Sequence, residues 1–82
     1  MQKRIGFVGI IVKNRAEHAD AVNRVLSEFG KMIVVRTGVP NVRGDWSVIT
    51  LVVDATSDEI GALTGKLGMI EGVSVKSALA KE

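Results

Sequence analysis

The chain of 82 residues is 46% hydrophobic and contains no cysteine, which excludes disulfides, iron–sulfur clusters and thiolate metal sites. Its net charge of +2 comes from 11 basic and 9 acidic residues interspersed along the sequence, which is weak support for nucleic-acid binding. No apolar run approaches the roughly 18 residues of a membrane-spanning helix, and no signal segment is evident. We therefore expect a cytoplasmic protein without membrane contact, folded as a single domain over residues 1–82.

The first half of the chain predicts a strand, a helix and a second strand. Apolar and β-branched residues fill residues 5–12 and 32–39, as is typical of strands. Asn14 and Glu17 have the spacing of a helix capping box, and Gly30 suits a helix end. Between them, apolar residues recur at the i, i+3, i+7 and i+10 spacing of an amphipathic helix, namely Ala19, Val22, Leu26 and Phe29.

The second half repeats this order. A tight loop at residues 40–45 leads into predicted strands at residues 46–53 and 73–79. Thr56 and Glu59 form a second capping box between those strands. A shift of 41 residues places the first helical stripe on the second, which consists of Ile60, Leu63, Leu67 and Ile70.

Two consecutive βαβ units predict an α+β fold, the ferredoxin-like βαββαβ sandwich. We expect an antiparallel four-stranded sheet in the order 4-1-3-2, with both helices on one face. Alternate residues of a strand face opposite sides, and both central strands are apolar on both sides. Since two helices cover only one face, we expect the other face, with Phe7, Trp46 and Val48, to meet a second subunit in a dimer or tetramer.

Glycines are concentrated in the predicted second helix. Three residues lie between Gly61 and Gly65 and Leu67 follows Lys66, whereas a phosphate-binding P-loop needs four intervening residues and a hydroxyl after the lysine. An interior glycine costs a helix about 1 kcal/mol relative to alanine. We therefore expect this glycine strip (Gly61, Gly65 and Gly68) to admit close packing of another helix or subunit, with close approach of a ligand as the alternative.

Three segments resemble a known family: "DEIGALTGKLGMIEGVSVK" at residues 58–76, "VVRTGVP" at residues 34–40 and "SVITLVVD" at residues 47–54. They are similar to the small iron-only hydrogenase system regulator family, which is ACT-like and close to the C-terminal ligand-binding domain of the nickel-responsive repressor. The resemblance covers nearly the whole chain. It implies a ferredoxin-like oligomeric sensor or regulatory module.

The sequence lacks the residues that other functions of this fold require. The third predicted strand, "WSVITLVV", lacks the motif of an RNA-recognition module, and a metallochaperone would need paired cysteines. The nickel-responsive relative implies a metal site, but His18 is the single histidine and we expect it to be a surface residue that binds no metal. No catalytic set of side chains can be assembled, and residues 1–82 leave no helix-turn-helix. We expect neither enzymatic activity nor a bound cofactor.

Two places are candidates for a small anionic effector. The segment "RTGVPNVRGD" gathers two arginines, which bind carboxylates or phosphates, with polar neighbours: Arg36, Thr37, Asn41 and Arg43. The alternative comes from the resemblance, since ACT-like relatives often bind ligands between subunits through the first strand–helix loop and neighbouring glycines. That loop here spans residues 13–15, so the competing site is Asn14 with Gly61 and Gly65.

The sequence therefore predicts a homo-oligomeric regulatory domain, linked by resemblance to an iron-only hydrogenase system. A small molecule at or near a subunit interface would bias its association with a partner, including one that acts in transcription. The alternative is a protein-interaction module that binds no ligand and is stable only as an oligomer.

Overall fold

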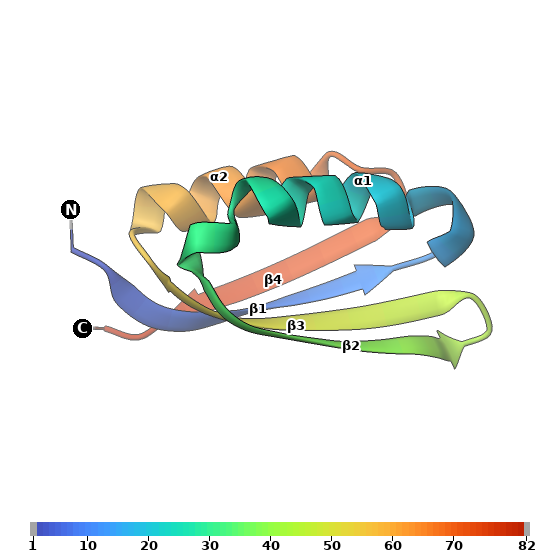
Figure 1. Ribbon diagram of the computed structural model, residues 1–82, viewed down its shortest axis with the longest axis horizontal. Coiled ribbons are helices and arrows are strands. Elements are labelled where there is room, and N and C mark those ends of the chain that lie inside the picture. Colours follow the sequence, from blue (N-terminus) through green and yellow to red (C-terminus); the bar gives the residue numbers. More distant parts are fainter. Residues whose placement is uncertain (1, 82) are drawn as a thin grey trace.

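The computed structural model describes residues 2–81, which form a layer of two helices on one face of a four-stranded sheet (Figure 1). Neither helix in this part of the chain is long and apolar enough to span a membrane. In chain order the elements are β1 (Arg4–Val12), α1 (Arg15–Glu28), the 3-10 turn η1 (Gly30–Met32), β2 (Ile33–Arg43), β3 (Trp46–Ala55), α2 (Ser57–Gly68) and β4 (Val73–Leu79).

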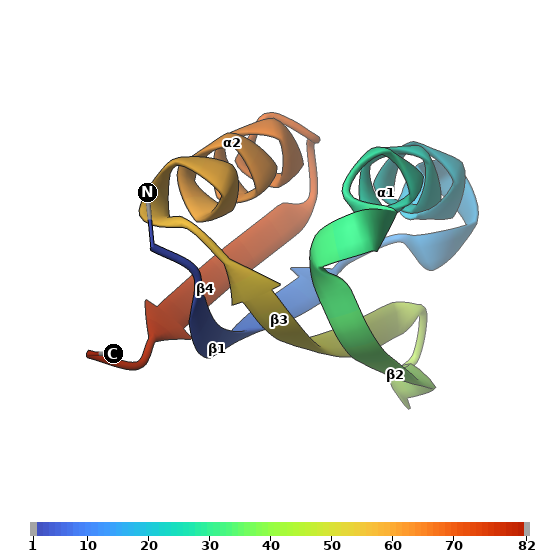
Figure 2. The ribbon, with the colours of Figure 1, turned by 60° about the vertical axis from the view of Figure 1, so that its left-hand side comes forward.

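The strands lie in the order β2-β3-β1-β4, and every neighbouring pair is antiparallel. Turning the molecule by 60° shows α1 and α2 on the same side of the sheet, with the opposite side bare (Figure 2). This is the ferredoxin-like architecture and the strand order that the repeated βαβ pattern predicts, so both expectations are confirmed.

The core lies between the helix layer and the sheet. Strand alternation turns Val8 and Ile10 of β1 and Leu51 and Val53 of β3 toward the helices, where all four are fully buried. The helical stripes supply the other side of the core with Val22, Leu26, Ile60, Leu63 and Leu67.

The hairpin between the middle strands is longer than predicted. β2 continues through Arg43, so most of residues 40–45 is strand rather than loop, and only Gly44 and Asp45 make the turn. Gly44 has φ +67°, which glycine adopts without steric cost. Pairing with β3 shifts between Val39 and Arg43, where Asn41 has φ 57°. Pro40 lies in this irregular stretch of an edge strand, where its missing N–H is tolerated.

Of the two predicted capping boxes, the one in α2 forms and the one in α1 does not. In α2 the Thr56 hydroxyl accepts a hydrogen bond from the Glu59 backbone N–H at 3.1 Å, and the Thr56 N–H donates to the Glu59 carboxylate at 2.9 Å. That box is confirmed. In α1 the prediction is wrong, because Asn14 is left-handed (φ 51°) and its side chain makes no capping bond. The Asp45 carbonyl of the hairpin turn instead accepts from the Arg15 N–H at 2.9 Å.

The end of α1 also differs from the prediction. The helix ends at Glu28, with Phe29 as its C-cap, and Gly30 begins η1 rather than closing the helix. The Phe29 N–H donates back to the carbonyls of Leu26 and Ser27, which satisfies the last turn without a left-handed glycine.

Gly6 determines how closely β1 and β4 approach each other. A Cβ atom on buried Gly6 of β1 would overlap the Ala78 carbonyl oxygen and lie 2.6 Å from the Leu79 Cδ2 atom. Gly9 lies in the same strand, but a Cβ there would meet nothing within 4 Å. The β1–β4 pairing therefore requires glycine at residue 6 and tolerates a side chain at residue 9.

We predict that Gly6→Ala lowers the free energy of unfolding by about 1–3 kcal/mol, because the added methyl group overpacks β1 against β4. Gly9→Ala in the same strand is the matched control, and it should be neutral or slightly stabilising. Urea denaturation of the two variants measures both changes. Equal stability of the two would contradict the tight approach at Gly6.

The capping boxes generate a prediction about pH. The hydrogen bond from the Thr56 backbone N–H lowers the pKa of the Glu59 carboxyl below its ordinary value of 4.5. The carboxylate therefore contributes stability that is fully present above pH 4.5 and is lost as pH falls through the lowered folded-state pKa. Glu59→Gln should flatten the fall in denaturation midpoint over that range. Glu17→Gln, at the same position of α1, should leave the slope unchanged.

Candidate functional site

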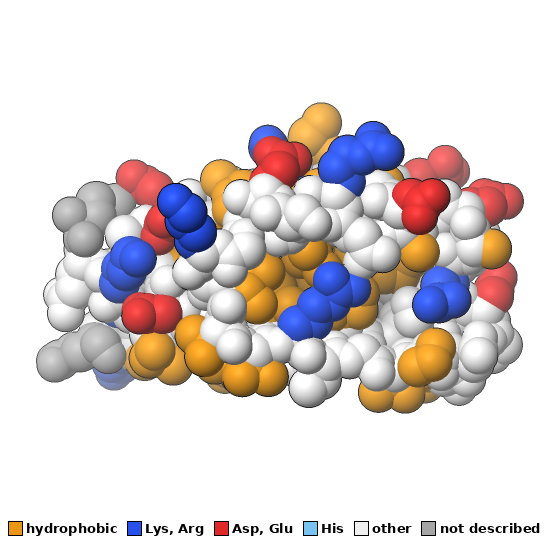
Figure 3. All heavy atoms as spheres, viewed as in Figure 1, with side chains coloured by type: hydrophobic (Ala, Val, Ile, Leu, Met, Phe, Trp, Pro, Cys, Tyr) orange, Lys and Arg blue, Asp and Glu red, His pale blue; other side chains and the backbone are white. Residues whose placement is uncertain are grey.

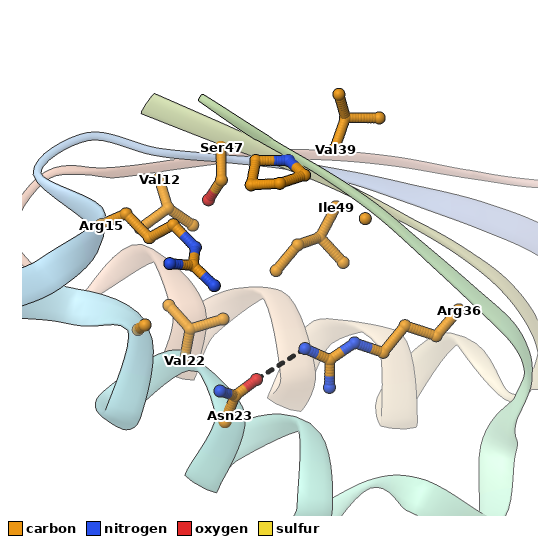
Figure 4. Close-up of a pocket in the computed structure, with 11 residues that line it drawn as sticks. Val12, Arg15, Val22, Asn23, Arg36, Val39, Ser47 and Ile49 are labelled. Atoms are coloured by element: carbon orange, nitrogen blue, oxygen red, sulfur yellow. Dashed lines mark hydrogen bonds between the residues drawn. The ribbon is translucent and has the colours of Figure 1, made fainter. Parts of the chain in front are cut away.

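A cavity of about 180 Å³ lies between α1 and the β2–β3 hairpin. It exists because β2, at the edge of the sheet, presents Gly38 and Pro40 on its helix-facing side, where larger side chains would fill the space. Hydrophobic side chains are visible in a hollow between the helix and sheet layers, with basic side chains beside it (Figure 3). The close-up in Figure 4 draws the residues that line the cavity.

Two arginines converge on the cavity from different elements. Arg15 is the first residue of α1 and Arg36 lies on β2, and both are exposed, so their guanidinium groups stand at the opening rather than in the core (Figure 4). The Nη2 atom of Arg36 donates a hydrogen bond to the Asn23 side-chain oxygen at 2.6 Å. The lining contains no aspartate or glutamate, so the two positive charges meet no acidic side chain inside the cavity.

The rest of the lining combines an apolar floor with one hydroxyl group. Val12, Val22 and Ile49 belong to the core and close the inner side of the cavity. Ser47 is the one polar residue among the buried residues of the described chain, at 7% exposure, and its hydroxyl points into the cavity (Figure 4). The arrangement can hold a small molecule with a negatively charged end and an apolar body.

The ligand residues predicted on the hairpin do not come together. Arg36 lines the cavity, but Thr37 is the next residue of a strand and so faces the opposite side, where it pairs with Thr50. Arg43 lies over the Trp46 ring, 5.4 Å from its centroid, and neither it nor Asn41 lines the cavity. The structure therefore does not bring these four residues into one cavity, and their role in binding a ligand stays a prediction.

The glycine strip makes no packing contact within the chain. A Cβ atom on Gly61 or Gly65 would meet nothing within 4 Å, so the expected close approach of another helix is wrong for residues 2–81. Lys66 does not stand in a phosphate loop either. Its Nζ atom lies 2.7 Å from a Glu28 carboxylate oxygen and 5.8 Å from the centroid of the Phe29 ring. Contact of the strip with a subunit or a ligand stays a prediction.

The loop before α1 is held by His18 and Gly72. The Lys13 carbonyl accepts a hydrogen bond from the His18 Nδ1 atom at 2.9 Å, and the Lys13 N–H donates to the Gly72 carbonyl at 2.8 Å. Asn14 follows in this loop and does not line the cavity between α1 and the hairpin. Across residues 2–81, no three His, Cys, Asp or Glu side chains gather as metal ligands.

The uncovered sheet face carries the residues predicted for an oligomer interface. Phe7 is 59% exposed, and Trp46 and Val48 are partly exposed on the same face. The Lys13 Nζ atom lies 4.8 Å from the centroid of the Trp46 ring, and the Arg43 guanidinium group lies over the same ring. Other large apolar side chains continue this open face, namely Ile5, Ile11, Val35, Val39 and Val52.

Two polar cavity residues, Asn23 and Ser47, were absent from the predicted sites, and Arg15 entered them only as the last residue of the loop at residues 13–15. One signal was present, because Arg15, Ala19 and Asn23 are spaced by four and so share one face of α1. Nothing in the sequence places that face over Arg36, since the pairing depends on how α1 lies across the sheet.

Comparison with known proteins identifies the family of this chain. The family model described as "TM1266-like: Iron-only hydrogenase system regulator, putative" matches residues 4–77. The structure of the uncharacterized protein TM1266 from Thermotoga maritima is 39% identical, with a TM-score of 0.91, and the match covers 98% of this chain and 100% of that chain. No curated protein matches.

More distant structures share the fold. The ACT domain from GTP pyrophosphokinase of Chlorobium tepidum is 20% identical with a TM-score of 0.73, and the match covers 94% of this chain and 100% of that one. A nitrogen regulatory PII-like protein from Thiomonas intermedia K12, solved with ADP, AMP and bicarbonate, is 17% identical with a TM-score of 0.55, covering 95% and 93%. The ACT-like fold implied by the sequence resemblance is thus confirmed, and the chain belongs to the TM1266-like family of iron-only hydrogenase system regulators.

Proposed function

We propose that this protein is a regulatory domain that acts as a homo-oligomer and alters its association with a partner when it binds a small anionic effector. Its family links that role to an iron-only hydrogenase system. The observation that carries the proposal is the open face of the sheet, which is apolar although no helix covers it.

The open face has the form of an assembly surface. In the sheet register Phe7 lies beside Val52, and Val52 beside Val35, so one apolar row crosses three strands. A second row runs through Ile11, Val48 and Val39. Burial of apolar surface stabilises association by about 25 cal/mol for each Å² removed from water. A second copy of the chain presents the same rows, so two copies can cover each other around a two-fold axis.

The structural neighbours support a ligand-responsive role through the fold they share with this chain. The ACT domain belongs to a larger enzyme, GTP pyrophosphokinase, and the PII-like protein is a nitrogen regulatory protein that was solved with nucleotides and bicarbonate. We propose that the same fold here serves regulation rather than catalysis, and that any effect on transcription passes through a protein partner.

The alternative of an interaction module without a ligand rests on the same open face. Thermal unfolding of the whole chain with amino acids, nucleotides, small carboxylic acids and divalent metals separates the two. A ligand that binds the folded state raises Tm in proportion to its saturation. A concentration-dependent rise in Tm supports the sensor, and an unchanged Tm across the whole screen supports the interaction module.

We predict that Phe7→Ser weakens self-association by roughly 2 kcal/mol or more, because an aromatic side chain at the centre of the open face loses its burial. Met69→Ser is the matched control, since Met69 is 86% exposed at the end of α2 and lies outside that face. Sedimentation equilibrium of the two variants and the unchanged chain measures the effect. A chain that is monomeric at micromolar concentration, or a Phe7→Ser variant that assembles normally, would count against the proposed interface.

The glycine strip offers a separate test of where subunits meet. In an isolated chain Gly65→Leu should stabilise α2 by up to about 1 kcal/mol, because leucine favours helix and meets no neighbour there. If a second subunit packs on the strip, the same change should destabilise the oligomer by several kcal/mol. The sign of the shift in denaturation midpoint, measured at low and high protein concentration, distinguishes these cases.

A further inference from the structure

We propose that the cavity between α1 and the β2–β3 hairpin is the effector site, and that its ligand is a small carboxylic acid that carries an apolar tail and no amino group. The inference rests on the proposed function, because it names the site and the ligand class of the effector assumed there.

The charge of the lining selects an anion. Arg15 and Arg36 bring two guanidinium groups to the opening, and no aspartate or glutamate lines the cavity to neutralise them. Guanidinium groups bind carboxylates and phosphates through paired, charge-assisted hydrogen bonds. The Asn23 side chain already accepts a hydrogen bond from Arg36, which fixes that arginine over the cavity on one side.

The same lining disfavours an amino acid. A bound ammonium group needs carbonyl or carboxylate acceptors, and an unpaired buried charge is costly. The lining offers no carboxylate, and the Asn23 side-chain oxygen already accepts the 2.6 Å bond from Arg36, which leaves it one free lone pair. Two cationic side chains nearby would also repel an ammonium group. A carboxylate without an amine therefore fits this lining better than a zwitterion does.

Size and polarity restrict the rest of the ligand. A dry cavity of about 150 Å³ accommodates a molecule such as benzene, so a cavity of about 180 Å³ accepts roughly six to eight non-hydrogen atoms. A whole nucleotide would extend beyond this space. Inorganic phosphate would leave the floor of Val12, Val22 and Ile49 uncovered, whereas a short branched tail would pack on it. The Ser47 hydroxyl can then donate to an oxygen of the ligand (Figure 4).

The test uses isovalerate as the probe, because it is a branched carboxylate of this size. Isovaleramide replaces its charge with a neutral amide, and valine adds one amino group to the same skeleton. Titration calorimetry with the whole chain should show isovalerate binding in the millimolar range or tighter. Isovaleramide and valine should each bind at least roughly tenfold more weakly, because each loses a favourable charge interaction or gains an unfavourable one.

Variants locate the site. Arg15→Gln and Arg36→Gln should each weaken isovalerate binding roughly tenfold or more. Arg24→Gln removes the same charge from an exposed position of α1 outside the cavity, and it should bind as the unchanged chain does. Ala19→Leu fills the cavity from the helix side and should abolish binding while all arginines remain. Circular dichroism of each variant without ligand shows that the fold is retained.

The outcomes separate the site from the wider function. Equal binding of valine and isovalerate overturns the proposed ligand class. Unchanged binding in Arg36→Gln and Ala19→Leu overturns the proposed site. If no small carboxylate binds but another compound of the thermal screen raises Tm, the effector site lies elsewhere and the regulatory proposal stands. If nothing in either experiment binds, both proposals fail.

Discussion

The constraint on which the rest of this structure depends is that two central strands are apolar on both faces while the chain supplies only enough helix to cover one. β1 and β3 place fully buried residues such as Ile10 and Leu51 toward the helices and Phe7 and Val52 away from them. The buried side stabilises the fold by the hydrophobic effect. The other side remains in contact with water in a single chain, which is unfavourable and is relieved when another surface covers it.

The cavity also arises because the two helices cover the sheet incompletely. β2, at the edge of the sheet, is exposed along nearly its whole length. Where β2 passes under α1 it presents glycine and proline, so the space there is filled only partly. The long aliphatic parts of Arg15 and Arg36 can cover apolar surface at the opening while their charged ends stay in water. A hollow with an apolar floor and a positive rim follows from these features.

Sequence reasoning reached the architecture because hydrophobic periodicity is a local signal, and each helix and strand carries it. The limits are visible in the two capping boxes. Thr56/Glu59 and Asn14/Glu17 have the same spacing, yet only the Thr56/Glu59 box forms. Asn14 is left-handed, and the Glu17 N–H donates to the Asn14 backbone carbonyl instead of its side chain. The site shows the same limit. Strand alternation alone separates Arg36 from Thr37, but only the position of α1 across the sheet brings Arg15 beside Arg36.

β2 connects the two surfaces physically. Arg36 and Gly38 face the cavity, while Val35 and Thr37, which alternate with them, face the open side of the sheet. Val39 also borders the cavity, but its side chain points away from it (Figure 4). A molecule bound between α1 and Arg36 and a subunit packed on Val39 would therefore contact opposite sides of one strand. That strand is hydrogen-bonded to β3 on one side only, and its pairing is irregular at both Ile33/Val35 and Val39/Arg43. It is thus an edge strand with two irregularities in its pairing. If a ligand and a second subunit both bind best to the same position of β2, each raises the affinity for the other by the same factor, which is the requirement for coupling an effector to assembly.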